Sequence, residues 1–186
     1  MKKALIFWFT GLSGAGKTTV ATGVNQQLDQ AGYRTFILDG DEVRKNYHSH
    51  LGFSPEDIRK NNALIVELCR ENQAKYDVIL VPIISPYLDS RQKARATLGP
   101  HFYEIYIRAS LSCVMERDVK GLYTKAKQNQ MDNLIGFSAG SVYELPPSPD
   151  CLIDCETQSS EQSIRHLYDF IVDQVRLHKE QNQAVK

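Results

Sequence analysis

The stretch Gly11–Thr18, with the sequence GLSGAGKT, matches the pattern G-x-x-x-x-G-K-[ST] and carries an additional glycine, Gly14, inside it. The apolar run Ala4–Phe9 precedes it, and apolar residues at helical spacing follow it from Val20 to Ala31. A glycine-rich turn between a buried strand and a helix lets successive backbone N–H groups point at phosphate oxygens, and the helix N-terminus adds positive potential. We therefore expect a phosphate-binding loop that holds a nucleoside triphosphate.

Two side chains of this loop should act directly on the nucleotide. Lys17 should reach the β- and γ-phosphates, and the Thr18 hydroxyl should ligate Mg²⁺, so ATP and Mg²⁺ are the expected cofactors. The other residues of this stretch that we expect to contact the nucleotide are Gly11, Ser13, Gly14, Ala15, Gly16 and Thr19.

The rest of the chain alternates short apolar runs with helical patterns. Strands are predicted at Arg34–Leu38, Val78–Ile84, Phe102–Ile107 and Cys151–Cys155. Helices are predicted from Pro55, over Leu88–Leu98, over Leu111–Arg117 and around Ile164–Val175. This alternation predicts an α/β domain of three layers, in which helices cover both faces of a five-stranded, mainly parallel sheet. That is the P-loop nucleoside-triphosphate hydrolase fold. We expect one kinase domain over residues 1–178 and a polar, frayed tail over residues 179–186.

Residues 118–149 carry Lys, Gly, Asn, Ser and Pro with little periodicity. We expect this segment to be a mobile lid that closes over the phosphates and excludes water, as a kinase needs in order not to waste ATP. The lid and the short length of the chain favour a small kinase over a motor or a switch.

The charge balance excludes several classes of partner. Lys plus Arg and Asp plus Glu both number 22, so the chain offers no global field for nucleic acid or membrane surfaces. Its longest apolar runs are too short to span a bilayer, and the first reads as a buried strand rather than a signal peptide. We therefore expect a cytoplasmic protein whose cysteines are free thiols: Cys69, Cys113, Cys151 and Cys155.

An acceptor site is expected next to the phosphate loop. The stretch Asp39–Arg44, DGDEVR, lies just past the second predicted strand, and ligands of open parallel sheets bind outside the carboxyl ends of the strands. A carboxylate at this place can align an acceptor hydroxyl and take its proton, or hold water on Mg²⁺.

Four stretches resemble the adenylyl-sulfate kinases. They are Leu38–Arg44, Leu51–Asp57 (LGFSPED), Ile84–Tyr87 (ISPY) with Asp89 and Arg91, and Glu116–Tyr123 (ERDVKGLY) with Lys125 and Ala126. The resemblance runs in order from about residue 5 to residue 172. It implies transfer of the ATP γ-phosphoryl group to the ribose 3′-hydroxyl of adenosine 5′-phosphosulfate.

The same resemblance implies roles for individual residues. Asp41 would orient the acceptor hydroxyl, Lys120 would neutralise charge near the transferred phosphoryl group, and Arg117 would lie against ATP. The acceptor would be held by Arg44 and Asn61, by stacking on Phe53, and by the backbone of Ile84 and Ser85. A small-molecule nucleotide is thus the expected partner, and we also consider a homodimer.

The chain departs from the family pattern at three places. Ile58 stands where the family usually has Arg, Asn62–Leu64 replaces an arginine-rich stretch, and Leu134 aligns with a second stacking aromatic. Arg59 and Phe137 are the candidates to supply the missing contacts. Two alternatives stay open at this stage: the same chemistry on a cytidine diphosphate derivative such as cytidine diphosphoramidate, and a catalytically degenerate ATP-binding partner protein.

Overall fold

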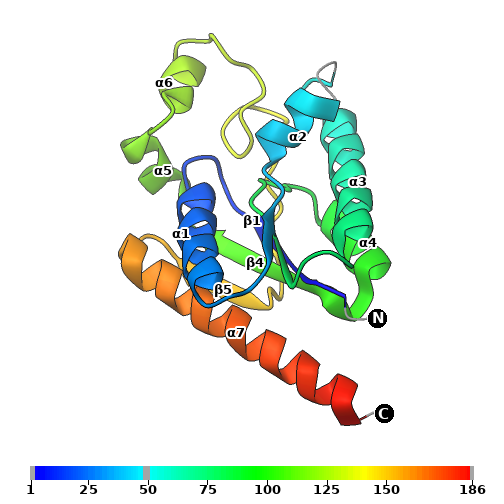
Figure 1. Cartoon of the computed structure of the whole chain (residues 1–186). Coiled ribbons are helices and arrows are strands. Elements are labelled where there is room, and N and C mark those ends of the chain that lie inside the picture. Colours follow the sequence, from blue (N-terminus) through cyan, green and yellow to red (C-terminus); the bar gives the residue numbers. More distant parts are fainter. Residues whose placement is uncertain (1–2, 48–50, 185–186) are drawn as a thin grey trace.

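The structure, a computed structural model, describes residues 3–47 and 51–184 of the chain. Its centre is a five-stranded sheet in the order β2-β3-β1-β4-β5, and every neighbouring pair of strands is parallel (Figure 1). The strands are β1 (Leu5–Thr10), β2 (Thr35–Ile37), β3 (Val78–Val81), β4 (Phe102–Arg108) and β5 (Cys151–Asp154). The α-helices are α1 (Lys17–Gln30), α2 (Gly40–Tyr47), α3 (Pro55–Asn72), α4 (Leu88–Leu98), α5 (Leu111–Arg117), α6 (Leu122–Lys127) and α7 (Ser160–Ala184), and a 3-10 turn, η1, covers Gly99–His101.

The sheet separates two hydrophobic cores. Successive side chains of β1 alternate between them, so Phe7 and Phe9 pack with α1 and α7, whereas Ile6 and Trp8 pack with α3 and α4. All four side chains have no exposed surface. A strand buried on both faces needs a continuous apolar run, which explains why β1 shows no alternation with polar residues. The predicted three-layer α/β fold is confirmed.

Local sequence signals fix where the long helix α3 begins. Ser54 precedes it in extended conformation and accepts a hydrogen bond from the Asp57 N–H at 3.2 Å, while Pro55 occupies the first helical turn. Proline costs nothing there because the first-turn N–H groups lack helical partners anyway. This cap fixes the residue at which α3 begins.

The strand order brings the motifs together. β2, β3 and β1 are neighbours, and their carboxyl ends lead into Asp39–Arg44, Pro82–Tyr87 and the glycine-rich loop. Segments far apart in the sequence therefore meet at one edge of the sheet, in the region below α2 and α6 in Figure 1.

Two helices are not predicted from the sequence. The stretch after β2 is helical, as α2, and the expected lid contains a helix, α6. The last helix extends beyond the expected boundary at residue 178, to Ala184. In addition, β3 ends at Val81, before Pro82, because proline cannot donate to a sheet ladder. Among the described helices, none is long and apolar enough to cross a membrane.

Candidate active site

The phosphate loop has the backbone geometry that the glycines predict. Gly16 precedes α1 with φ of 104°, in the left-handed region that residues with a Cβ rarely adopt. Gly11 lies so close to β4 that a Cβ on it would be 2.4 Å from the carbonyl oxygen of Ile107. The loop can therefore curl tightly only with glycine at these two positions.

The start of α1 is suited to an anion. No side chain caps its first N–H groups, and no acidic residue lies in its first turn. The positive end of the helix dipole is thus not cancelled by the protein itself. Thr18 and Thr19 are exposed in this turn, so the Thr18 hydroxyl is accessible to a hydrated metal ion beside the phosphates. These features fit ATP together with Mg²⁺.

Lys17 is held inside the loop. Its side chain is buried, and its Nζ donates to the carbonyl oxygens of Gly11 at 2.9 Å and Leu12 at 2.7 Å. Both bonds tie the ammonium group to the loop that would surround the phosphates, so its charge already lies where phosphate charge is expected.

The first part of the lid is anchored to this loop. Tyr123 of α6 is buried and donates its hydroxyl to the carbonyl oxygen of Ser13 at 2.9 Å. Burial raises the pKa of Tyr123 to about 12, so the hydroxyl keeps its proton at physiological pH. Phe137 packs edge-to-face against the Tyr123 ring with 6.0 Å between centroids.

Lys120 and Arg117 come from the same region. Lys120 is exposed in the turn between α5 and α6, which Asp118 fixes by accepting hydrogen bonds from the Tyr123 and Thr124 N–H groups. Arg117 donates to the carbonyl oxygen of Cys155 at 2.6 Å. The Cys155 Sγ lies 3.6 Å from the point where a Cβ on Gly16 would be, so Arg117 is tethered beside the phosphate loop.

On the acceptor side, Arg44 and Phe53 meet. Arg44 donates to the carbonyl oxygen of Gly52 at 2.5 Å, and its guanidinium carbon lies 4.6 Å from the centroid of the Phe53 ring. Phe53 is 58% exposed, which leaves a face of the ring open for a base to stack on. Asp41 is the second residue of α2, but its side chain lies outside the described part of the structure.

Asn61 provides an unsatisfied polar atom. The residue is 4% exposed, and its Oδ1 has no hydrogen-bond partner among the described residues. Leaving such a group unpaired costs free energy, so this oxygen can accept a hydrogen bond from a ligand or a water molecule. The neighbouring Asn62 instead donates to the Ser85 hydroxyl at 3.1 Å.

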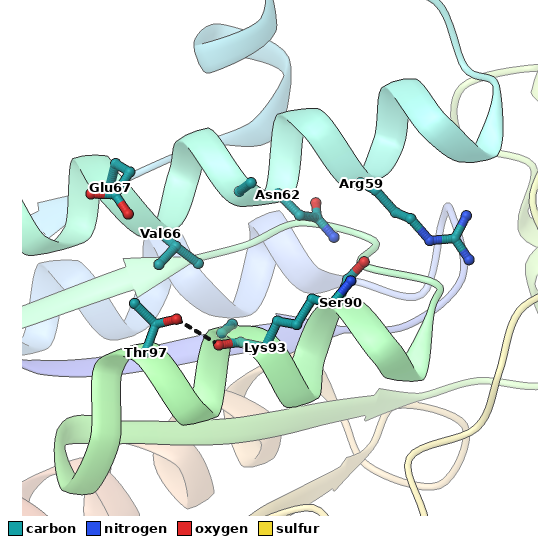
Figure 2. Close-up of a pocket in the computed structure, with 9 residues that line it drawn as sticks. Arg59, Asn62, Val66, Glu67, Ser90, Lys93 and Thr97 are labelled. Atoms are coloured by element: carbon teal, nitrogen blue, oxygen red, sulfur yellow. Dashed lines mark hydrogen bonds between the residues drawn. The ribbon is translucent and has the colours of Figure 1, made fainter.

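Arg59 contacts residues at the start of α4. Its Nε donates to Asp89 at 2.9 Å, and its guanidinium carbon lies 4.3 Å from the Tyr87 ring centroid. It borders a cavity of about 200 Å³ between α3 and α4, which Figure 2 shows with Val66 and Lys93 among its lining residues. The cavity lies along the helices rather than at the phosphate loop.

Two of the departures from the family pattern, at Ile58 and Leu134, are buried in the packed interior. Ile58 is buried in a small apolar cluster with Tyr87 and Ile135, and Leu134 is buried in the core that contains β1 and α1. The Ile58 side chain therefore joins α3 to the expected lid segment through apolar packing, at the position where the family usually has an arginine.

Sequence reasoning missed one group of residues at the site. Thr10, at the end of β1, donates to the carbonyl oxygen of Ile84 at 2.9 Å, and its hydroxyl lies 2.9 Å from that of Tyr143. Arg91 is 1% exposed. It appeared in the family resemblance but received no role, because a fully buried guanidinium is not visible in a sequence.

Comparisons with known proteins agree with this geometry. The sequence model of the adenylylsulphate kinase family matches residues 3–154. Adenylyl-sulfate kinases of Oceanobacillus iheyensis and Halothermothrix orenii are both 40% identical to the chain, over 92% and 91% of it and over 85% and 90% of their own lengths. The structure of the Mycobacterium tuberculosis APS kinase CysC in complex with AMPPNP and APS superposes with a TM-score of 0.86 at 31% identity, covering 93% of this chain and 99% of that one.

A more distant likeness concerns the fold alone. A gluconokinase from Sinorhizobium meliloti has a TM-score of 0.60 at 15% identity, covering 97% of this chain and 98% of its own. This likeness shows that the two proteins share the fold. On the family model and the curated relatives, the chain belongs to the adenylyl-sulfate kinase family of ATP-dependent P-loop kinases.

Proposed function

We propose that the chain transfers the γ-phosphoryl group of ATP to the ribose 3′-hydroxyl of adenosine 5′-phosphosulfate, giving 3′-phosphoadenosine 5′-phosphosulfate and ADP. One observation supports the proposal: in a chain of this family, the phosphate loop after β1 and the stretch Asp39–Arg44 after β2 follow strands of one parallel sheet, and Arg44 contacts the exposed ring of Phe53. The similar M. tuberculosis kinase is known with an ATP analogue and APS together.

Positioning and charge stabilisation would do most of the work. Phosphoryl transfer passes through a loose transition state, so in-line alignment of the two substrates matters more than early proton removal. Lys17 would hold the β- and γ-phosphates, Lys120 would approach from the lid turn, and Asp41 would accept a hydrogen bond from the 3′-hydroxyl. Thr18 would hold Mg²⁺ through its hydroxyl, and the metal ion would supply positive charge that offsets the charge of the phosphates.

The acceptor would be recognised by stacking and by hydrogen bonds. The exposed face of Phe53 suits a base, and the unpaired Oδ1 of Asn61 can accept from an exocyclic amino group. The comparisons favour adenylyl sulfate over a cytidine diphosphate acceptor, because the curated relatives with 34–40% identity carry the adenylyl-sulfate kinase name. Ile58 packs against Ile135 of the expected lid segment, so the isoleucine at this position can be explained without a different acceptor.

Further proposals concern setting and assembly. We propose a cytoplasmic location. All four cysteines are free thiols among the described residues, and three of them are buried, as is usual in a reducing compartment. A homodimer stays a prediction, which sedimentation of the purified chain would test.

An ADP-release assay tests the acceptor. We expect turnover with adenosine 5′-phosphosulfate to exceed turnover with a cytidine diphosphate derivative, or with no acceptor, by about a hundredfold or more, the discrimination that roughly 3 kcal/mol of differential contacts supplies. Faster turnover with the cytidine compound would reassign the acceptor. A rate of ADP release that is the same with each acceptor and without any would count against kinase activity.

A further inference from the structure

Ser85, in the loop after β3, has an unusual backbone conformation. Its φ is +42°, in the left-handed region that favours glycine, and the residue is 2% exposed. A serine persists in such a conformation only where surrounding groups hold it, and residues held in this way cluster at functional sites.

Three buried side chains hold Ser85, each from a different element. The single hydroxyl proton of Thr10 on β1 is shared between the carbonyl oxygens of Ile84 at 2.9 Å and Ser85 at 3.1 Å. Asn62 of α3 donates to the Ser85 hydroxyl at 3.1 Å. Arg91 of α4 donates through Nη1 to the Ser85 carbonyl oxygen at 2.7 Å. Thr10, Asn62 and Arg91 are 0%, 5% and 1% exposed, so water does not compete for these bonds.

Arg91 also reaches the end of the lid. Its Nη2 donates to the carbonyl oxygen of Glu144 at 2.7 Å. The Glu144 N–H in turn donates to the carbonyl oxygen of Pro86 at 2.9 Å, and the Glu144 carboxylate accepts a hydrogen bond from the Leu88 N–H at 2.5 Å. The Arg91 guanidinium therefore joins the loop that contains Ser85 to the C-terminal part of the expected lid, at Glu144.

The charge of Arg91 is balanced inside the protein. Its Nε lies 2.6 Å from Glu104 Oε1 of β4, with side chains 1% and 8% exposed, in a charge contact rather than an aligned hydrogen bond. Buried ion pairs are poor sources of stability compared with apolar packing. What arginine supplies here is a rigid planar fork that spans two acceptors at fixed geometry.

We propose that Arg91 is a positioning residue, which fixes the Ser85 backbone for acceptor binding and ties the closing end of the lid to it. The inference rests on the proposed function, in which the backbone of Ile84 and Ser85 lines the acceptor pocket. Because Arg91 is 1% exposed, it would act through Ser85 and Glu144 and not by touching a substrate.

The test compares two conservative variants on one helix. Arg91→Lys keeps the positive charge beside Glu104 but cannot fork to Ser85 and Glu144. Arg95→Lys is the matched control, because Arg95 also lies near Glu104, at 3.8 Å, and ion-pairs with Asp150 at 2.5 Å. We expect Arg91→Lys to raise the acceptor KM about tenfold or more while the ATP Kd changes by less than about twofold, and Arg95→Lys to change neither.

A second readout needs no substrate. Amide exchange at Leu88 and Glu144 in the unliganded protein should be about tenfold faster in Arg91→Lys and unchanged in Arg95→Lys, because local opening of this junction becomes easier. Asn62→Ala removes another tether of Ser85 without touching the ion pair, and should raise the acceptor KM in the same selective way. That variant keeps the proposal testable if Arg91→Lys does not fold.

Unchanged amide exchange and an unchanged acceptor KM in folded Arg91→Lys would overturn the inference, as would an equal loss of ATP affinity. Failure of the unmodified protein to phosphorylate adenosine 5′-phosphosulfate is a separate result: it would overturn the proposed function, and with it the acceptor half of this inference.

Discussion

At the scale of single residues, the proposed site divides into side chains that would act on ATP and side chains that would act on the acceptor. Lys17 is held by the carbonyl oxygens of its own loop, whereas Arg44 of α2 contacts the ring of Phe53, which precedes α3. Substitutions in the two groups should therefore separate ATP binding from acceptor binding.

Lys17→Ala and Asp41→Ala should both lose activity, for different reasons. Lys17 would stabilise charge on the transferred phosphoryl group, so its removal should lower kcat by about a hundredfold or more. Asp41→Ala should retain ATP affinity, measured by calorimetry, because its proposed partner is the acceptor hydroxyl. Lys60→Ala is the control, since that exposed lysine pairs only with Glu56 in the contacts described. Weaker ATP binding with intact transfer in Asp41→Ala would contradict its acceptor-side role.

Phe53→Ala should raise the acceptor KM about tenfold, because stacking of a base on an aromatic ring contributes roughly 1–3 kcal/mol. The ring is 58% exposed, so the substitution should leave the melting temperature nearly unchanged. Leu177→Ala, at a residue of α7 that is 44% exposed, is a control for loss of surface apolar area. An unchanged KM would show that the base stacks elsewhere.

At the scale of elements, the lid has anchored parts and an exposed part. α6 is anchored through Tyr123, and Leu134 and Ile135 are buried, but every residue of the stretch 127–133 except Met131 is exposed. We therefore expect the predicted lid to move mainly in this connecting stretch, which follows Lys125 and includes Lys127.

Trypsin should cut the lid at Lys125 or Lys127, and an ATP analogue together with the acceptor should slow that cut severalfold. Ligand phosphates would draw these lysines inward and order the stretch. Tyr123→Phe removes the hydrogen bond to Ser13 and should speed cutting without ligands while keeping the ring packing. Cutting at one rate with and without both ligands would argue against a lid.

At the scale of the whole molecule, the fold was largely predictable, while the junctions at the site were not. Apolar runs and caps located β1 and predicted α4 and α5 with their observed bounds. α2 and α6 escaped prediction because both are short and polar, and packing against the rest of the chain decides such helices. The contacts of Arg91 escaped because they join elements far apart in the sequence, and no local pattern encodes them.

Acid should destabilise the folded protein through paired carboxylates. A hydrogen bond from Arg108 lowers the pKa of Asp154 to about 2, and one from the Thr124 hydroxyl lowers the pKa of Asp118. A lowered folded-state pKa stabilises the protein at pH values above the ordinary pKa of the group, and this contribution is lost as the pH falls toward the folded value. The melting temperature should thus change little between about pH 8 and 5 and fall below about pH 4. The melting temperature of Asp154→Asn should fall less steeply with decreasing pH than that of the unmodified protein. Identical dependence of the melting temperature on pH in the two proteins would refute this assignment.

The position of the new phosphate on the ribose decides whether the two halves of the site work together as inferred. Product made from ATP and adenosine 5′-phosphosulfate can be purified and studied by phosphorus–proton NMR correlation, with ADP measured in parallel. We predict one new phosphomonoester, coupled to the ribose 3′ proton, for each ADP released. A phosphate coupled to the 2′ proton, or ADP released without any phosphorylated nucleotide, would contradict the account.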